Sequence, residues 1–425
     1  MIRFTQSARL ALVVASATML AVSGLTVPGA AAKTTLTFAN WADAENATRP
    51  GIQKVIKDFE AAHPDIEIKS EAISFSEIAR QLVLRTRAGN VPDVAEIAGD
   101  DTFVLAQTGG LEPLDSYVSA DLKAKLKPTA LGAGMLQGKL IAFPWTEAPT
   151  GLWYNKSILK DAGLDPSRPP ATIDELMTAL AAIKKAKPDL IPFGMDTTNR
   201  SFALAFNWPW MATFGANPLA KSGAESPEMQ RYLAWMRDLA KKGYIDPNRR
   251  IGEFRPLAAQ GKVAMTWDGV LLQGVIQSAS KMSDADFYGT WGVAPLPKGP
   301  SGKSYSFEGG HQLVMFAKSA EKKAAFEFIT YLATSSEAIA NYTLPVESSL
   351  PPVNAATDPA LAAKLNTPVF KAFIDTVSPT VTVPPYGAGF AAAANVVMPA
   401  VQQAVTSDQP IDAIAKAMQQ QLANQ

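Results

Sequence analysis

Apolar residues recur in the first part of the chain at two spacings, one typical of strands and one of helices. Strand-like alternation over residues 36–38 precedes a helical stripe that ends before Pro64, and alternation returns over residues 66–68. The stripe has apolar residues at i, i+3, i+4 and i+7, namely Ile52, Val55, Ile56 and Phe59. The order strand, helix, strand predicts a βαβ unit and therefore parallel strands.

Similar patterns occur at two further places. A helix over residues 77–88, a Gly-Asn turn and a strand over residues 93–97 predict another unit of this kind. Later in the chain, a strand over residues 311–316 leads to Ser319, whose hydroxyl we expect to cap a helix. The apolar stripe of that helix consists of Ala325, Phe328, Ile329 and Leu332. Together these patterns predict an α/β protein in which helices cover a sheet.

Three proline-containing segments interrupt the alternating elements. They span residues 143–159, 291–300 and 342–352, and proline stiffens an extended chain at such places. The chain has 425 residues, 47% of them hydrophobic, which is more than one ordinary domain requires. We therefore expect two compact lobes that are joined by three crossing segments.

The N-terminal segment has the pattern of a secretory signal peptide. Arg3 and Arg9 precede an apolar run over residues 10–22, which is shorter than a membrane span, and the small residues 30–32 offer a cleavage site. Cysteine is absent, so we expect neither a disulfide framework nor an acylated cysteine anchor. We predict a signal peptide over residues 1–32 and a free protein in the periplasm.

Charge and motif content argue against several function classes. The chain has 39 basic and 39 acidic residues, and loss of Arg3 and Arg9 with the signal peptide leaves 37 basic residues, so no basic field for nucleic acid is expected. The usual sequence patterns of nucleophile, zinc and nucleotide sites are missing, and residues 284–289 only begin like a calcium loop. We expect no cofactor, no metal and no enzymatic activity.

Five segments, taken in order and spacing, carry a resemblance to a known family. They are VPDVAEIAGDD (91–101), LWYNKSIL (152–159), GKVAMTWDG (261–269), WGVAPLPKG (291–299) and the stretch from AAFEFITYLA to LPV (324–346). The chain resembles the extracellular solute-binding proteins of ATP-driven importers, the family that includes maltodextrin-binding protein. This resemblance implies a periplasmic-binding-protein-like α/β fold, in which three crossover segments join two lobes and a ligand lies in the cleft between them.

The resemblance also implies lobe boundaries. We expect the first lobe to comprise residues 33–145 and 298–345, and the second lobe to comprise residues 146–297 and 346–425. Closure of the lobes about their hinge would trap the ligand. The implied partners are a small-molecule ligand and the membrane permease subunits of an importer, and we expect the protein to be a monomer.

Ligand contacts implied by the resemblance fall mainly on loops at the ends of predicted strands. They are Trp41, Asp43, Gly99, Asp100, Trp145, Glu147, Trp208, Trp267, Asp268, His311, Tyr386 and Phe390. Core packing is the alternative role for the tryptophans, and capping of the following helix is the alternative for Asp100. Ile97 stands where some members have a tryptophan, which predicts one stacking surface fewer and a ligand shorter than an oligosaccharide.

The residue types favour a carbohydrate ligand. Aromatic faces cover the apolar C–H patches of a sugar ring, while Asp, Glu and Asn accept hydrogen bonds from its hydroxyls. We therefore expect a small sugar or sugar-like polyol. One alternative is an anionic sugar derivative, a phosphate or sulfonate, held by Arg49, Arg200 or Arg255. The other is a secreted glycosidase, since paired carboxylates can serve glycoside hydrolysis.

Overall fold

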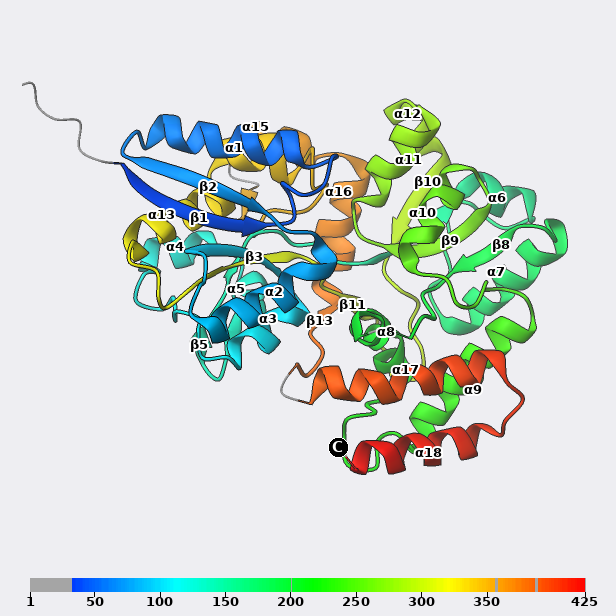
Figure 1. Cartoon of the computed structure of the whole chain (residues 1–425). Coiled ribbons are helices and arrows are strands. Elements are labelled where there is room, and N and C mark those ends of the chain that lie inside the picture. The colour runs from blue at the N-terminus through cyan, green and yellow to red at the C-terminus, as the bar shows by residue number, and fades with distance from the viewer. Residues whose placement is uncertain (1–32, 200, 356–357, 387–388, 425) are drawn as a thin grey trace, which may run out of the picture.

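The computed structural model describes residues 33–199, 201–355, 358–386 and 389–424. The predicted signal peptide and Arg200 lie outside the described residues. The described chain forms two α/β lobes that lie side by side, each with its own sheet (Figure 1). No helix in these ranges is long and apolar enough to cross a bilayer. The two-lobe α/β fold expected from the sequence is confirmed.

The first lobe is built on a five-stranded sheet. Its strand order is β2 (Ile66–Ala72), β1 (Thr34–Asn40), β3 (Val94–Ala98), β12 (His311–Met315) and β6 (Phe143–Pro144). β1 runs parallel to β2 and β3, as the sequence predicts, whereas β12 runs antiparallel to both β3 and β6. The N-terminal end of β12 therefore meets the C-terminal end of β3, and His311 lies opposite Ala98.

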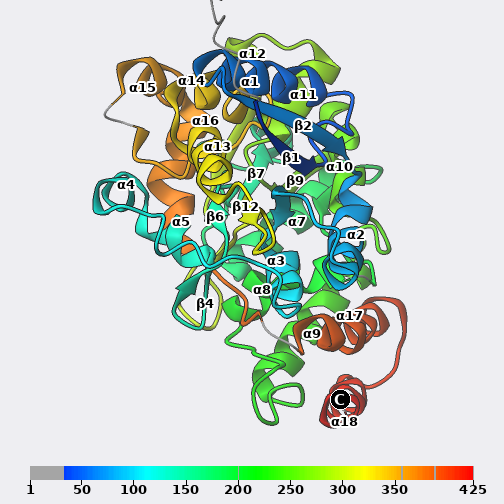
Figure 2. The ribbon, with the colours of Figure 1, turned by 60° about the vertical axis from the view of Figure 1, so that its left-hand side comes forward.

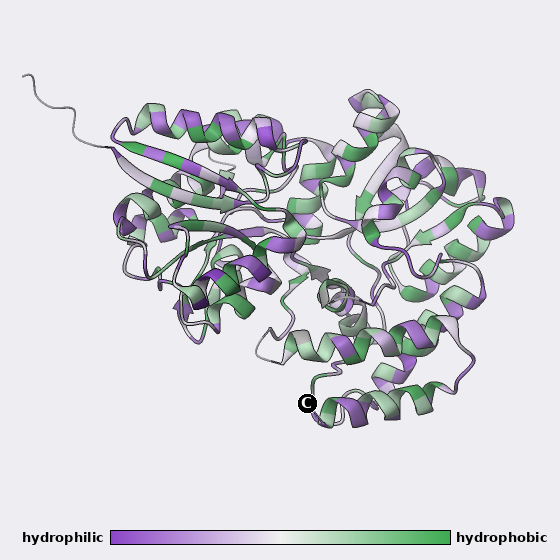
Figure 3. Cartoon of the chain, viewed as in Figure 1, coloured by the Kyte–Doolittle hydropathy of each residue, from purple (hydrophilic) through white to green (hydrophobic). Residues whose placement is uncertain are grey.

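Helices cover this sheet through the predicted apolar stripes. α1 (Arg49–Ala62) buries Ile52, Val55, Ile56 and Phe59, and α13 (Lys322–Thr334) buries Ala325, Phe328, Ile329 and Leu332. The ring of Phe328 lies 5.3 Å from that of Phe38 in β1 and 5.0 Å from that of Phe59 in α1. Polar residues alternate with these apolar ones along α1, on the side away from the sheet (Figure 3). Both helix predictions are confirmed.

The other helices of the first lobe include two near the edge of the cleft. α2 (Phe75–Ala88) ends at Gly89, whose φ of 75° is the left-handed conformation that glycine adopts without strain. α3 (Gly99–Ala106) begins directly after β3. The remaining helices are α4 (Ala120–Lys125), α5 (Pro128–Ala133), α14 (Ser336–Ala338), the π-helix η1 (Ile339–Thr343) and α15 (Pro359–Leu365).

Ser319 does not cap a helix, which corrects the prediction made from the sequence. α13 begins at Lys322, and Glu321 occupies its N-cap position without a side-chain cap bond. The hydroxyl of Ser319 instead donates to Asp93 Oδ1 at 2.6 Å. The carboxylate of Asp93 already accepts from the backbone and side chain of Thr37 in β1, so this bond ties the approach to α13 to the sheet.

The second lobe has a four-stranded sheet and most of the later helices. The strand order is β10 (Trp291–Ala294), β7 (Gly151–Asn155), β9 (Val263–Asp268) and β8 (Ile191–Gly194). Its helices are α6 (Lys156–Asp161), α7 (Ile173–Ala186), α8 (Ser201–Thr213), α9 (Pro227–Lys241), α10 (Ile251–Ala259), α11 (Leu272–Ser280), α12 (Asp284–Thr290), α16 (Pro368–Ala372), α17 (Phe390–Thr406) and α18 (Ile411–Ala423). α9, α17 and α18 pack together at one end of this lobe (Figure 2).

Two crossing segments follow directly from strand membership. The chain passes from β6 to β7 through residues 145–150, and it returns from β10 to β12 through β11 (Ser306–Phe307). β11 pairs with β13 (Val381–Thr382), a short sheet between the lobes (Figure 1). We propose that the third crossing lies between α15 and α16. Leu350 bridges to Glu147 in the first crossing segment and Val353 bridges to Leu126 in the first lobe, which supports a crossing later than the predicted boundary at 345.

Candidate functional site

A cavity of about 360 Å³ lies between the two lobes. Phe75, Ala98 and Gly99 line it from the first lobe, and α8 and α10 line it from the second lobe. Its floor is formed by the segment from Phe307 to Gly309 and by His311. The volume lies within the range of about 300 to 1,000 Å³ that is typical of small-molecule sites.

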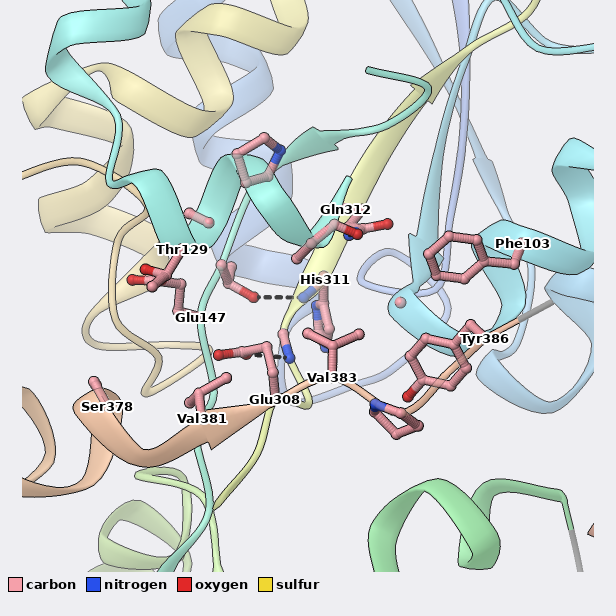
Figure 4. Close-up of a pocket in the computed structure, with 17 residues that line it drawn as sticks. Phe103, Thr129, Glu147, Glu308, His311, Gln312, Ser378, Val381, Val383 and Tyr386 are labelled. Atoms are coloured by element: carbon pink, nitrogen blue, oxygen red, sulfur yellow. Dashed lines mark hydrogen bonds between the residues drawn. The ribbon is translucent and has the colours of Figure 1, made fainter. Parts of the chain in front are cut away.

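A second and narrower cavity, of about 50 Å³, adjoins the first (Figure 4). Gly99, Glu308 and His311 line both cavities, so the two are neighbours across these residues. The other lining residues of the narrow cavity include Phe103, Glu147, Gln312, Ser378 and Tyr386. Figure 4 shows that they come from the first lobe, from the crossing segments between the lobes and from the stretch 378–386 around β13.

The sheet topology explains why the cavities lie here. β3 ends at Ala98 and α3 begins at Gly99, while β12 begins at His311 beside Ala98. Open α/β sheets bind ligands beyond the carboxyl ends of their strands, because loops and helix starts gather there. Gly99 and His311, both predicted from the sequence, are therefore brought together at the edge that faces the second lobe.

Aromatic rings face each other across the wide cavity. Phe75 is 43% exposed and stands edge-on against the ring of Trp41 at 5.2 Å. Phe202 and Phe206, from α8, are stacked on each other at 5.6 Å on the opposite side. None of these three phenylalanines was predicted from the sequence as a ligand contact. For Phe75 the available signal was its place at the start of α2, just beyond the carboxyl end of β2, as Trp41 stands just beyond that of β1.

The predicted tryptophan contacts lie behind this lining rather than in it. Trp41 is only 4% exposed and packs between Phe75 and His311. Trp267 is fully buried, with its ring 4.0 Å from Phe206, so Phe206 separates it from the cavity. Trp145 is fully buried and stacked on Tyr342. These rings support the surfaces that face the cavity, which corrects the expectation that they form those surfaces.

Other predicted contacts also have structural partners. Trp208 and Phe390 are buried against each other at 6.2 Å, and neither lines the two cavities. Asp43 accepts a hydrogen bond from Gln53 Nε2 at 2.9 Å, away from both cavities. Tyr386 lines the narrow cavity and stacks on Phe103 at 5.2 Å. The side chain of Asp100 lies outside the described part of the chain.

Asp268 does not line the wide cavity but positions Arg255, which does. Its carboxylate is almost fully buried and accepts two hydrogen bonds from Arg255, at 2.7 and 3.0 Å. Arg255 lines the cavity, whereas Asp268 lies behind it. The bidentate pair fixes the guanidinium and offsets its charge, so this arginine brings little uncompensated positive charge to the cavity.

A buried ionic cluster lies beneath His311. The fully buried Glu96 accepts hydrogen bonds from the backbone N–H groups of Trp41 and Ala42, and its other oxygen lies 3.0 Å from His311 Nδ1. Glu347 lies 3.8 Å from the same nitrogen. Glu96 could have been noticed in the sequence, because it is a charged residue within the otherwise apolar strand 94–98. This cluster holds the imidazole at the junction of the two cavities.

The surroundings raise the pKa of both members of this pair. Burial raises the pKa of Glu96 from 4.5 to about 7, although contact with His311 acts in the opposite direction. Burial lowers the pKa of His311, but Glu96 and Glu347 outweigh it and raise the pKa from 6.5 to about 9. Both groups therefore bind protons more tightly in the folded protein than in the unfolded chain.

This linkage predicts a pH-dependent stability. Raised pKa values stabilise the fold at low pH, and that contribution is lost as pH rises from 4.5 through 7 for Glu96 and from 6.5 through 9 for His311. We expect the thermal unfolding midpoint to fall between pH 5 and pH 9. The double variant Glu96→Gln with His311→Gln should show a smaller fall. An unchanged pH dependence in that variant would show that other groups control it.

Comparison with known proteins gives evidence about the function that is independent of this geometry. Residues 44–339, more than two thirds of the chain, match the sequence profile described as bacterial extracellular solute-binding protein. The chain belongs to this family. Its members are substrate-binding components of transporters that act outside the cytoplasm, rather than a family of enzymes.

Relatives of this solute-binding protein include carbohydrate binders. The maltotriose-binding protein of Pyrococcus abyssi is 27% identical over 298 residues, which cover 69% of this chain and 61% of that protein. The melibiose/raffinose/stachyose-binding protein MelE of Bacillus subtilis is 27% identical over 331 residues, which cover 72% of each chain.

Solved structures share the fold of this solute-binding protein. The cyclic alpha-maltosyl-1,6-maltose binding protein from Arthrobacter globiformis superimposes with a TM-score of 0.77 at 19% identity. The superposition covers 92% of this chain and 98% of that protein. At this identity the likeness describes the fold, not the ligand.

Proposed function

We propose that this protein captures a small saccharide in the periplasm and delivers it to the membrane permease of an ATP-driven importer. The observation that carries the proposal is the wide cavity between the lobes. Phe75 faces it from the first lobe, and Phe202 and Phe206 face it from the second lobe. Aromatic rings on both sides can cover the two apolar faces of a sugar ring, which neither lobe can do alone.

Polar groups on the floor of the cavity complement these rings. Glu308 and His311 can exchange hydrogen bonds with sugar hydroxyls, and Arg255 can donate to them. Because Arg255 is paired with Asp268, it does not favour an anionic ligand over a neutral one. The names of the relatives from Pyrococcus abyssi and Bacillus subtilis, which specify maltotriose and raffinose-type sugars, support the same ligand class.

Hinge closure supplies the coupling between binding and transport in this proposal. Crossing segments connect the two lobes, and rotation of the lobes about such segments is the hinge motion that this architecture favours. A saccharide that touches both lobes binds the closed form more tightly and so shifts the equilibrium towards it. The permease would then recognise the surfaces that closure brings together. The protein itself would perform no chemistry.

Titration calorimetry with a panel of mono- and oligosaccharides tests this function. We expect at least one saccharide to bind in a 1:1 complex, and a 100-fold excess over its Kd to add about 2.7 kcal/mol to the free energy of unfolding. The bound saccharide should be recovered intact. Binding of sugar phosphates or sulfonates alone would contradict the proposed ligand class, and release of hydrolysis products would show that the protein is a glycosidase.

A further inference from the structure

The size of the narrow cavity limits what it can hold. A single buried water needs roughly 10 to 15 Å³ of such space. A cavity of about 50 Å³ can therefore hold a few non-hydrogen atoms but not a sugar ring. Because it shares Gly99, Glu308 and His311 with the wide cavity, a ring in the wide cavity could extend a short substituent into it.

Most charged groups that line the two cavities already have ionic partners. Glu147 is paired with Lys127, and Arg255 is paired with Asp268. His311 lies against Glu96. Arg250 and Glu253 have opposite charges and stand exposed at the rim of the wide cavity. When Glu308 is not counted, the positive and negative charges of these groups therefore nearly cancel.

Glu308 differs from them because it forms no salt bridge with a described residue, although the nearby Lys127, already paired with Glu147, acts weakly to lower its pKa. Its Oε1 accepts hydrogen bonds from the backbone N–H groups of Ala148 and Gly310, at 2.7 and 2.8 Å, and Figure 4 draws the second of these bonds. Its Oε2 accepts none from the described residues. Burial and the neighbouring Glu147 raise the pKa of Glu308 from 4.5 to about 8. A positive charge brought by a ligand would favour its ionised form.

The remaining walls of the narrow cavity suit a positively charged group. Tyr386 and Phe103 present stacked rings, whose faces attract cations. The hydroxyl oxygen of Ser378 is buried without a hydrogen-bond partner and can accept one. The amide of Gln312 is already used, because it accepts from Thr102 and donates to the carbonyl of Ala133.

We propose that the narrow cavity binds a protonated amine carried by the saccharide, with Glu308 Oε2 as its main acceptor. The ligand would then be an amino sugar, whose ring lies in the wide cavity. This inference rests on the proposed function and narrows its substrate class. A charge-assisted hydrogen bond in a partly buried site distinguishes an ammonium group from the hydroxyl that replaces it in a neutral sugar.

Calorimetry with matched sugar pairs tests this proposal. The pairs are glucose with glucosamine, galactose with galactosamine, mannose with mannosamine, and cellobiose with the de-N-acetylated chitobiose. In at least one pair we expect the amine to bind about tenfold more tightly or better. Ionisation of Glu308 on binding at pH 7 should release up to about one proton per ligand, seen as a heat that depends on the buffer.

Two variants assign the effect to Glu308. Glu308→Gln keeps an oxygen that can accept the two backbone hydrogen bonds, so it should fold, but we expect it to lose the amine preference and the proton release. Glu67→Gln, an exposed change in β2, is the matched control and should keep both. An amine preference retained by Glu308→Gln would overturn the assignment.

Failure of this inference can be told apart from failure of the proposed function. If a neutral sugar binds as tightly as its amine partner in every pair that binds, the amine site is wrong while sugar binding stands. If no member of any pair and no saccharide of the wider panel binds, the proposed function is wrong and the amine inference falls with it.

Discussion

Replacing Trp267 with alanine should lower the free energy of unfolding by about 3 to 5 kcal/mol. The ring is fully buried and contacts Phe206 at 4.0 Å and Trp210 at 5.7 Å, so its removal leaves a large cavity in the second lobe. Urea unfolding followed by circular dichroism measures the change. Trp267→Phe keeps most of the apolar volume and should cost much less.

The same pair of variants separates a supporting role from direct ligand contact. Nε1 of Trp267 is buried without a hydrogen-bond partner, so Trp267→Phe removes no polar contact within the described residues. We expect that variant to bind saccharide nearly as well as the original protein. A Trp267→Ala variant of unchanged stability that no longer binds saccharide would show that the ring contacts the ligand after all.

Replacing Phe75 with alanine should weaken saccharide binding by about tenfold to a hundredfold. Burial of a phenylalanine ring contributes about 1.5 to 3 kcal/mol, and a factor of ten in affinity corresponds to about 1.4 kcal/mol. Phe75 is already 43% exposed in the described structure, so the substitution should change the stability of the fold far less than Trp267→Ala. Calorimetry with the saccharide found in the panel measures the loss.

Leu84 provides a matched control for Phe75. It lies on the same helix, α2, and is 51% exposed, but it lines neither cavity. Leu84→Ala should therefore leave the affinity unchanged. An equal loss of affinity in both variants would point to a general effect on α2, and no loss in Phe75→Ala would remove this ring from the site.

The elements of the fold could be predicted from the sequence because each has a strong local signal. The stripes of α1 and α13 decide which helix face is buried, and those predictions are confirmed. The antiparallel direction of β12 has no such signal, since it depends on where the chain re-enters the first lobe. The prediction that Ser319 caps a helix was wrong for a related reason, because its hydrogen-bond partner Asp93 is 226 residues away in the sequence.

The site was less predictable because its lining depends on which of several neighbouring side chains faces the cavity. Trp267 and Phe206 have similar chemistry, and only the packing of α8 against β9 decides that Phe206 faces the cavity. His311 and Gly99 could be predicted to line the cavities because they mark strand ends at one edge of the sheet, and their contact with a ligand stays a prediction. Glu308 was not predicted, since nothing in the sequence shows that its carboxylate lies in this lining without a salt bridge.

Closure of the two lobes over a saccharide can be measured directly, because the chain has no cysteine that would compete with introduced labels. Lys57 in α1 and Lys185 in α7 are exposed residues of different lobes, and each can be replaced by cysteine and spin-labelled. Pulsed electron paramagnetic resonance then gives the distribution of distances between the lobes. We expect a bound saccharide to shorten and narrow this distribution. An unchanged distribution at a saturating saccharide concentration would contradict capture by closure.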